Sequence, residues 1–254
     1  MTLKAKREYD SAIIDYKKAL KIYSEDYKGS YHVDVPLDLV KSLYALASKK
    51  SRTALMKQLK SDWNSAIPKN KTWVKEYFKK GDLIVFHEVS NIAIKRAKEF
   101  VFGFGKQVVR FSFPYIKSQR FYGGKTGIEV PGKPFTKGEI AQDMDAIAEV
   151  TLNDRRGRML VKSAARLLAK GQLTEQAHRN YGPLAGIAVN IFSAATETAD
   201  TRGWTLLPRM FYVSRVRLSP GQHKVKIYTD GVLNDIKTVQ IKQNRTQFFR
   251  MFRK

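Results

Sequence analysis

Residues 82–89 read Asp82-Leu-Ile-Val-Phe-His-Glu-Val89. This stretch is short, apolar and rich in β-branched side chains, so we expect a mostly buried strand. It follows Gly81 and marks the point where the spacing of apolar residues changes from helical to strand-like. The sequence therefore predicts a helical region upstream and a mixed region downstream.

Three helices are expected upstream. Across residues 3–23, apolar residues recur at steps of three and four with lysines between them, which is typical of an amphipathic helix. Residues 24–34 are polar and are expected to form a connection. The second helix follows Pro36, which suits a first helical position, with Asp34 as a candidate cap. The third helix ends before Pro68.

Downstream of the opening strand, residues 92–97 and 107–113 alternate between apolar and polar side chains and predict two further strands. Glycine and proline at 123–134 indicate a long loop. Apolar stripes from about residue 138 to Gly171 predict helix, and the small residues of 183–198 predict another helix that packs closely against its neighbours.

The last fifty residues are expected to form strands at 211–218, 223–228, 237–242 and 246–252. Asp230-Gly231 is a strong hairpin signal between two of them. We therefore predict that the chain ends in an antiparallel β-meander. Together these elements predict an α+β protein, with a helical region at 1–80 and a mixed domain at 81–254 that has central helices.

The composition gives the chain a large excess of positive charge. The chain has 254 residues, of which 43% are apolar, with 47 Lys and Arg against 23 Asp and Glu, so its formal charge is +24. The apolar content excludes a disordered polymer. The absence of cysteine excludes disulfides and thiolate zinc sites. The positive charge predicts attraction to nucleic acid, anionic lipid or acidic cell-wall polymer.

Basic side chains alternate with aromatic ones along the predicted C-terminal strands, an arrangement that can track a polyanion. The alternative is ordinary: aromatic residues face the core and charged residues face water. Phe248 and Phe249 are adjacent, so one of them should point outward, which keeps the binding hypothesis open. The candidate polyanion-binding residues are Arg215, Arg217, Lys224, Lys226, Lys237, Lys242, Arg250 and Arg253.

No familiar catalytic constellation stands out. The four histidines lie far apart in the sequence, and none has metal-ligand spacing with another. We expect His87 to be a core or sheet-face histidine with its hydrogen bonds satisfied. Asp143 and Asp145 would face different sides of a helix, and Gly103-Phe-Gly-Lys resembles a turn between strands. The sequence predicts no catalytic residue, no metal and no cofactor.

Residues 198–204 read Thr-Ala-Asp-Thr-Arg-Gly-Trp. We expect Asp200 and Arg202 to pair at a helix end, while Trp204 anchors the first strand of the meander. This would make a structural corner. The alternative is that Asp200, Arg202 and Trp204 form an interaction site.

Several blocks of the sequence resemble a family of bacterial TPR-containing envelope proteins. The family is of the periplasmic or outer-membrane lipoprotein type and is often encoded near penicillin-binding-protein-activator lipoproteins. The block at 9–20 is similar to the second helix of a TPR unit. The blocks that carry the resemblance are residues 9–20, 81–86, 113–115, 143–148, 182–186, 198–204, 207–208 and 218–223.

The resemblance implies TPR-like helical hairpins in the first 80 residues, a periplasmic, outer-membrane-associated location and a scaffolding role without an active site. Its partners would be envelope proteins, with anionic lipid or peptidoglycan nearby. Two features depart from the family: the chain begins at about the second helix of a unit, without a signal peptide or lipidated cysteine, and its charge is high. We therefore expect an N-terminally shortened member. A basic cytoplasmic protein that binds nucleic acid is the alternative.

Overall fold

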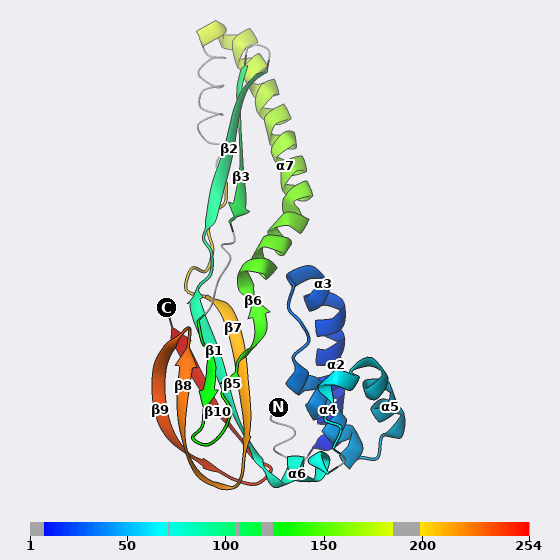
Figure 1. Cartoon of the computed structure of the whole chain (residues 1–254). Helices are drawn as coiled ribbons and strands as arrows, with labels where there is room; N and C mark the ends of the chain where they lie inside the picture. Colours follow the sequence, from blue (N-terminus) through cyan, green and yellow to red (C-terminus); the bar gives the residue numbers. More distant parts are fainter. Residues whose placement is uncertain (1–7, 71, 105–106, 118–123, 185–198, 254) are drawn as a thin grey trace. The chain divides into compact units, whose positions relative to one another are not determined.

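The structure is a computed structural model, and it shows an α+β protein (Figure 1). Two compact units divide the chain. Unit 1 comprises residues 1–91, 120–144 and 208–254, and unit 2 comprises residues 92–119 and 145–207. The residues that the structure describes are 8–70, 72–104, 107–117, 124–184 and 199–253.

The helical part of unit 1 is built around one buried helix, α4, whose apolar residues face several neighbours. Val40, Leu43 and Leu46 are completely buried, and they share one core cluster with Ile13 and Leu59 of the flanking helices. The helical elements are α2 (Tyr9–Ile22), η1 (Tyr23–Tyr27), α3 (Lys28–Tyr31), α4 (Leu37–Lys49), α5 (Thr53–Asp62), η2 (Asn64–Ala66) and α6 (Trp73–Lys79).

The three expected helices are present, and Pro36 stands at the N-cap of α4, one position before the first helical residue. The polar connection predicted at 24–34 is wrong over most of its length, because helical backbone continues through η1 and α3 to Tyr31. Tyr23, Tyr27 and Tyr31 lie four residues apart, and neighbouring rings contact each other at 5.0 Å (tilted) and 5.2 Å (edge to face) between centroids. These contacts favour helix over a polar loop.

The strands of unit 1 form two four-stranded sheets. The first sheet has the order β10-β1-β7-β6, and the second has the order β5-β4-β8-β9. The strand expected at 82–89 is confirmed as β1. The strands are β1 (Gly81–Asn91), β4 (Gly127–Glu129), β5 (Thr136–Lys137), β6 (Glu139–Asp143), β7 (Pro208–Leu218), β8 (Gly221–Thr229), β9 (Val232–Ile241) and β10 (Thr246–Arg253).

The first sheet is covered by the second sheet on one face and by the helices on part of the other, where Phe86 and Phe248 stay 36% and 40% exposed. On one face, Leu83, Val85 and Leu218 join Val225 and Ile227 of the second sheet in a buried apolar cluster. Side chains alternate across a strand, so neighbouring positions point to the other face. There the helical layer packs against the sheet, which explains why β1 is apolar on both sides.

The predicted C-terminal meander is wrong except for the β8–β9 hairpin. β7 pairs with β1 and β6, and β10 lies parallel to β1 instead of beside β9 in a ladder. The turns at 219–220 and 242–245 carry the chain from one sheet to the other. The turn between β8 and β9 has the backbone conformation expected of an Asp-Gly hairpin, since Asp230 and Gly231 both have positive φ, 52° and 79°.

Unit 2 contains a long β-hairpin, β2 (Lys95–Phe104) with β3 (Gln107–Ile116), and the helix α7 (Met144–Tyr181). The helix expected from residue 138 begins only at Met144, because residues 139–143 form β6 beside β7. It then continues past Gly171. Most of the helix expected at 183–198, and the turn at 105–106, lie outside the described residues.

The units differ from the expected domains. Residue 80 does mark the change from helix to strand, but the helices and the two sheets share unit 1, and unit 2 is an insertion in two segments. Across the described residues, the structure contains no helix with the length and apolar character needed to span a membrane.

Candidate binding sites

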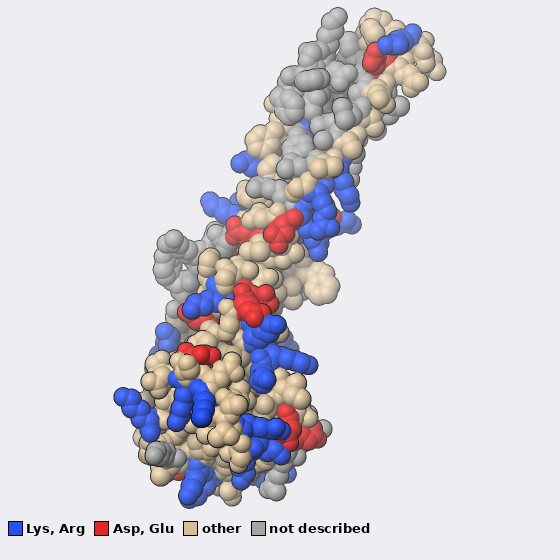
Figure 2. Space-filling model, turned by 90° about the vertical axis from the view of Figure 1, so that its right-hand side faces the viewer, with Lys and Arg blue, Asp and Glu red and all other residues tan. Residues whose placement is uncertain are grey.

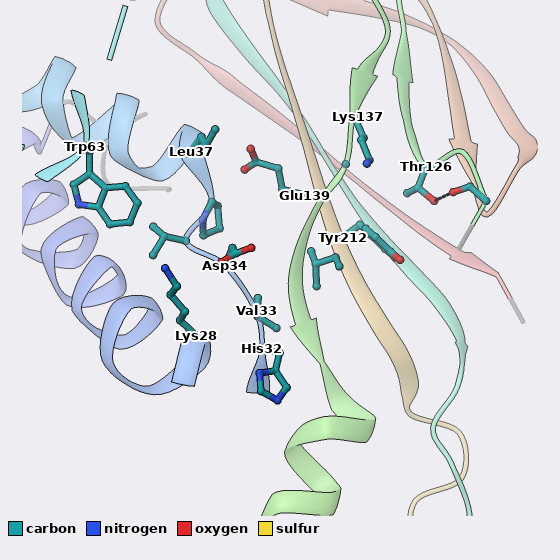
Figure 3. A pocket seen from close by; sticks show the side chains of 15 residues that line it. Lys28, His32, Val33, Asp34, Leu37, Trp63, Thr126, Lys137, Glu139 and Tyr212 are labelled. Carbon is teal, nitrogen blue, oxygen red and sulfur yellow. Dashed lines mark hydrogen bonds between the residues drawn. The ribbon is translucent and has the colours of Figure 1, made fainter. Parts of the chain in front are cut away.

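A hollow of about 730 Å³ opens in unit 1 beside β5 and β6 (Figure 3). Its opposite wall is the segment that connects α3 to α4. The volume lies in the range of small-molecule pockets. The lining residues are Lys28, His32, Val33, Asp34, Val35, Pro36, Leu37, Trp63, Gly124, Thr126, Lys137, Gly138, Glu139, Ile140 and Tyr212.

Two lysines from different walls of this hollow are exposed. Lys28 comes from α3, and Lys137 comes from β5 (Figure 3). In the described part of the chain, the structure records no ion pair for either ammonium group. The exposed Asp34 and the half-buried Glu139 line the same hollow, so its lining carries charges of both signs.

Glu139 is a half-buried carboxylate in the same hollow. The backbone N–H groups of Leu37 and Asp38, in the first turn of α4, favour its charged form. Burial raises its pKa, and the nearby Asp38 carboxylate raises the pKa further.

The wall formed by β5 and β6 is an edge of both sheets. Gly138 lies between the two strands, and its N–H donates to the Thr126 carbonyl at 2.8 Å. Further along, the Tyr23 hydroxyl donates to the Ala141 carbonyl at 2.9 Å. The Tyr27 hydroxyl oxygen accepts from Gln142 Nε2 at 3.1 Å. The tyrosines thus cover the end of β6, while residues 137–140 line the hollow.

Arg215 lies in a buried polar network between the first sheet and the helices. Its guanidinium donates to both carboxylate oxygens of Asp82, at 3.2 and 2.9 Å, and to the Tyr77 hydroxyl at 3.0 Å. It also donates to the hydroxyl of Ser42 on α4. Arg217 adds a bond to Asp82 at 2.9 Å. Arg215 is therefore a structural residue that joins α4, α6 and β7.

The eight basic residues predicted from the C-terminal strands do not share one face. Arg215 and Arg217 face the helices, and Arg250, Lys226 and Lys237 form ion pairs with Glu88, Glu129 and Asp235. Arg253 donates to the Thr229 carbonyl at 3.4 Å. Lys224 and Lys242 are exposed, and no ion pair is recorded for them within the described ranges. Figure 2 shows acidic groups among the basic ones on the visible face.

The second predicted group, in unit 2, consists of Asp200, Arg202 and Trp204. The structure brings only part of this group together. Arg202 donates to both carboxylate oxygens of Asp200 at 3.0 Å, and this pairing lowers the pKa of Asp200 to about 2. The Arg202 side chain is 91% exposed and Trp204 is 80% exposed. Trp204 is thus exposed and not part of a core, and the expectation that it anchors the first strand of the meander stays a prediction.

His87 is the satisfied core histidine that we expected. It is completely buried, its Nδ1 lies 2.9 Å from Thr229 Oγ1, and its Nε2 lies 2.8 Å from Ser214 Oγ. Among the residues that the structure describes, no group of histidines and carboxylates could hold a metal ion.

Sequence reasoning missed the hollow, because its walls come from five separate segments of the chain. A partial signal was available: Lys137-Gly138-Glu139 follows Pro131, Gly132 and Pro134, so an edge strand could have been weighed against a helix start. No family model, no curated protein and no solved structure matches the chain.

Proposed function

We propose that this protein is a non-enzymatic scaffold or assembly factor of a bacterial cell envelope. It would bind protein partners near an anionic membrane or cell-wall polymer. The observation that carries the proposal is a group of exposed apolar side chains in unit 2, which we call the Trp204 patch: Ile94, Trp204 and Leu206.

The three side chains are 63%, 80% and 76% exposed. Two hydrogen bonds hold their segments together: Ile92 N–H donates to the Leu207 carbonyl at 2.8 Å, and Lys95 Nζ donates to the Arg202 carbonyl at 2.9 Å. Large apolar side chains that gather at a surface mark interaction sites, and tryptophan is enriched among the residues that dominate binding energy. We therefore infer that the surface of a partner protein covers the Trp204 patch.

The envelope location and the TPR-like character of the N-terminal helices rest on the resemblance of the sequence to the envelope family. The charge of +24 supports a location beside an anionic surface. There each nearby Lys or Arg contributes about 1 kcal/mol at low salt, so a few exposed lysines would hold the protein in place.

Photo-crosslinking in living cells tests the partner. A photoreactive amino acid at Trp204 or Ile94 should give a discrete adduct with another protein, whereas the same amino acid at Lys224 in unit 1 should not. Adducts at Lys224 only, or at none of the three positions, would overturn the proposal.

Fractionation tests the location. The full-length native gene product should appear in the envelope fraction, and its mature N-terminus should be processed. A cytoplasmic protein with an unprocessed start would contradict the envelope assignment and leave nucleic acid as the leading partner.

A further inference from the structure

β9 is the outer strand of the second sheet in unit 1, and its far edge is open over residues 232–239. The sheet order β5-β4-β8-β9 ends at this strand (Figure 1). In the described part of the chain, β9 pairs with β8 alone, and no other backbone hydrogen bond joins residues 232–239 to another segment. An open edge of this kind can pair with a further strand.

Two contacts show which main-chain groups face the open edge. The Gln247 side chain on β10 donates from Nε2 to the Gln240 carbonyl at 2.8 Å. Lys237 lowers the pKa of the Asp235 carboxylate, and the backbone N–H of Ile236 lowers it further. Both contacts come from outside the β8–β9 ladder. Since hydrogen-bonding groups alternate along a strand, Ile236 and Gln240 direct their N–H and C=O groups away from β8.

The exposed side chains near this edge are apolar. Ile236 is 47% exposed, and Val232 and Leu233 beside the hairpin turn are 44% and 41% exposed. Edge strands usually carry charged side chains at such positions, because charge discourages pairing with another chain. An exposed isoleucine does the reverse, since its removal from water favours association.

Two opposite charges flank Ile236. The Asp235 carboxylate and the Lys237 ammonium group form an ion pair at 2.7 Å. Lys237 Nζ also lies 5.3 Å from the centre of the Phe249 ring on β10. Side chains alternate along a strand, so Asp235 and Lys237 share the face toward the first sheet, while Ile236 lies on the outer face. The tripeptide Asp-Ile-Lys is therefore complementary to itself when it is reversed.

This self-complementarity selects a second copy of the chain and one register. An antiparallel ladder between identical strands has a two-fold axis. An axis at Ile236 places Asp235 opposite Lys237 of the second copy, and Lys237 opposite Asp235. An axis at Asp235 or at Lys237 would place like charges opposite each other, which is destabilising. An axis at Thr238 would place Lys237 opposite the buried Val239.

We propose that two copies of the chain form a dimer by antiparallel pairing of their β9 strands about a two-fold axis at Ile236. The two Ile236 residues exchange backbone hydrogen bonds, and their side chains meet on the outer face. Two pairs of Asp235 with Lys237 cross the interface on the other face. The second sheets of the two copies continue as one eight-stranded sheet. This inference goes beyond the proposed function and does not rest on it.

Sedimentation velocity of the full chain at increasing concentration tests the dimer. A ladder of a few residues is smaller than a standard interface, so we expect a Kd of about 10 µM. Lys237→Asp and Asp235→Lys each place like charges opposite each other and should raise the Kd at least about tenfold. Lys133→Asp changes an exposed lysine between β4 and β5 and should leave the Kd within about twofold.

Melting temperatures establish that the three variants fold. A wild-type chain that stays monomeric at about 200 µM would overturn the proposal. Equal Kd values in wild type, Lys237→Asp and Asp235→Lys would also overturn it, because the interface would then lie elsewhere.

Mixing the two charge variants tests the register. The Lys237→Asp chain carries two acidic groups beside Ile236, and the Asp235→Lys chain carries two basic groups there. An equimolar mixture should therefore form a heterodimer with a Kd within about threefold of the wild-type value, although each variant alone dimerises poorly. A fluorophore on one variant identifies the heterodimer. Absence of recovery in the mixture would contradict an axis at Ile236.

Introduced cysteines locate the axis directly, because the chain has no cysteine of its own. Ile236→Cys places two thiols opposite each other, with Cα atoms about 5.5 Å apart, within reach of a disulfide. Thr238→Cys is the matched control on the same face of β9, where the two thiols would be about 14 Å apart. Mild oxidation should link Ile236→Cys chains and leave Thr238→Cys chains unlinked. Equal yields, or no covalent dimer with Ile236→Cys, would contradict the register.

Discussion

His87 occupies a place where protonation is costly. Its imidazole is enclosed between the two sheets of unit 1, with the hydroxyls of Ser214 and Thr229 as partners. Neither hydroxyl carries a charge that could compensate an imidazolium ion. Burial therefore lowers the pKa of His87 from its ordinary 6.5 to about 4.

The stability of the protein should depend on pH through this residue. Above pH 6.5, His87 is neutral in both the folded and the unfolded chain, so it contributes no pH dependence. Between pH 6.5 and about 4, the unfolded chain binds a proton that the folded chain refuses, and the free energy of unfolding falls. From pH 7 to 4.5 the loss should be about 2–3 kcal/mol, measured by urea unfolding.

The His87→Gln variant should lack this component, since an amide can bond the two hydroxyls without titrating. The His223→Gln variant is the matched control, because it makes the same substitution at the surface, where His223 bonds the Ser219 carbonyl, and leaves His87 in place. The same pH slope in wild type and His87→Gln would contradict the assignment.

For Arg202, in contrast to His87, we expect no effect on stability. Its pair with Asp200 is formed across two residues of one exposed segment, and such pairs add little to stability because water screens them. Arg202→Ala should leave the melting temperature unchanged within error in a thermal scan. A clear drop in the melting temperature would instead support the structural corner that the sequence suggested.

At the scale of elements, Asp82 connects the helices to the first sheet. Its carboxylate compensates the buried charge of Arg215, which in turn holds Ser42 of α4 and Tyr77 of α6. Asp82→Asn removes that charge while it keeps the shape. We expect a loss of about 3–5 kcal/mol in the free energy of unfolding, measured with urea, because a buried charge is left without its counterion.

Asp235→Asn is the control for this variant. Asp235 pairs with Lys237 at 2.7 Å on the surface, so the free energy of unfolding should barely change. A similarly small effect of Asp82→Asn would mean that Arg215 is compensated by other groups.

Periodicity predicted which segments are helix or strand better than it predicted where they end. Ile140, Met144 and Ile147 have helical spacing, yet Ile140 belongs to β6 and the helix begins at Met144. The pairing of β6 with β7 outweighs a local pattern that fits both structures. For a related reason, the sequence could not predict which strands pair with each other. Alternation indicates the buried face of a strand but not which distant strand lies beside it.

At the scale of the molecule, the charge of +24 should govern binding to anionic surfaces. Vesicles that contain phosphatidylglycerol should retain the protein at about 50 mM salt and release it at about 500 mM, because salt shortens the range of the attraction. Co-sedimentation measures the bound fraction. Neutral phosphatidylcholine vesicles are the control, and retention on them at either salt concentration would contradict a charge-based mechanism.

The same assay separates the two partner classes. A short DNA duplex that binds tightly, with a steep decline of affinity with salt and no retention on vesicles, would favour the nucleic-acid alternative. The sequence predicted the charge but not its arrangement. Five of the eight basic residues expected to bind an anion together are paired with Asp82, Glu88, Glu129 or Asp235. Four of these five pairs join residues far apart in the sequence, and the fifth, Lys237 with Asp235, lies within β9.

The order β10-β1-β7-β6 also has a consequence for how the protein is made. β1 leaves the ribosome well before its two neighbours, residues 208–218 and 246–253, so neither exists until residues 92–207 have been made. Contacts of such long sequence separation close slowly. While residues 92–207 are being made, the nascent chain therefore presents an apolar strand with both edges open, and we expect a holding chaperone to keep that strand from pairing with other chains.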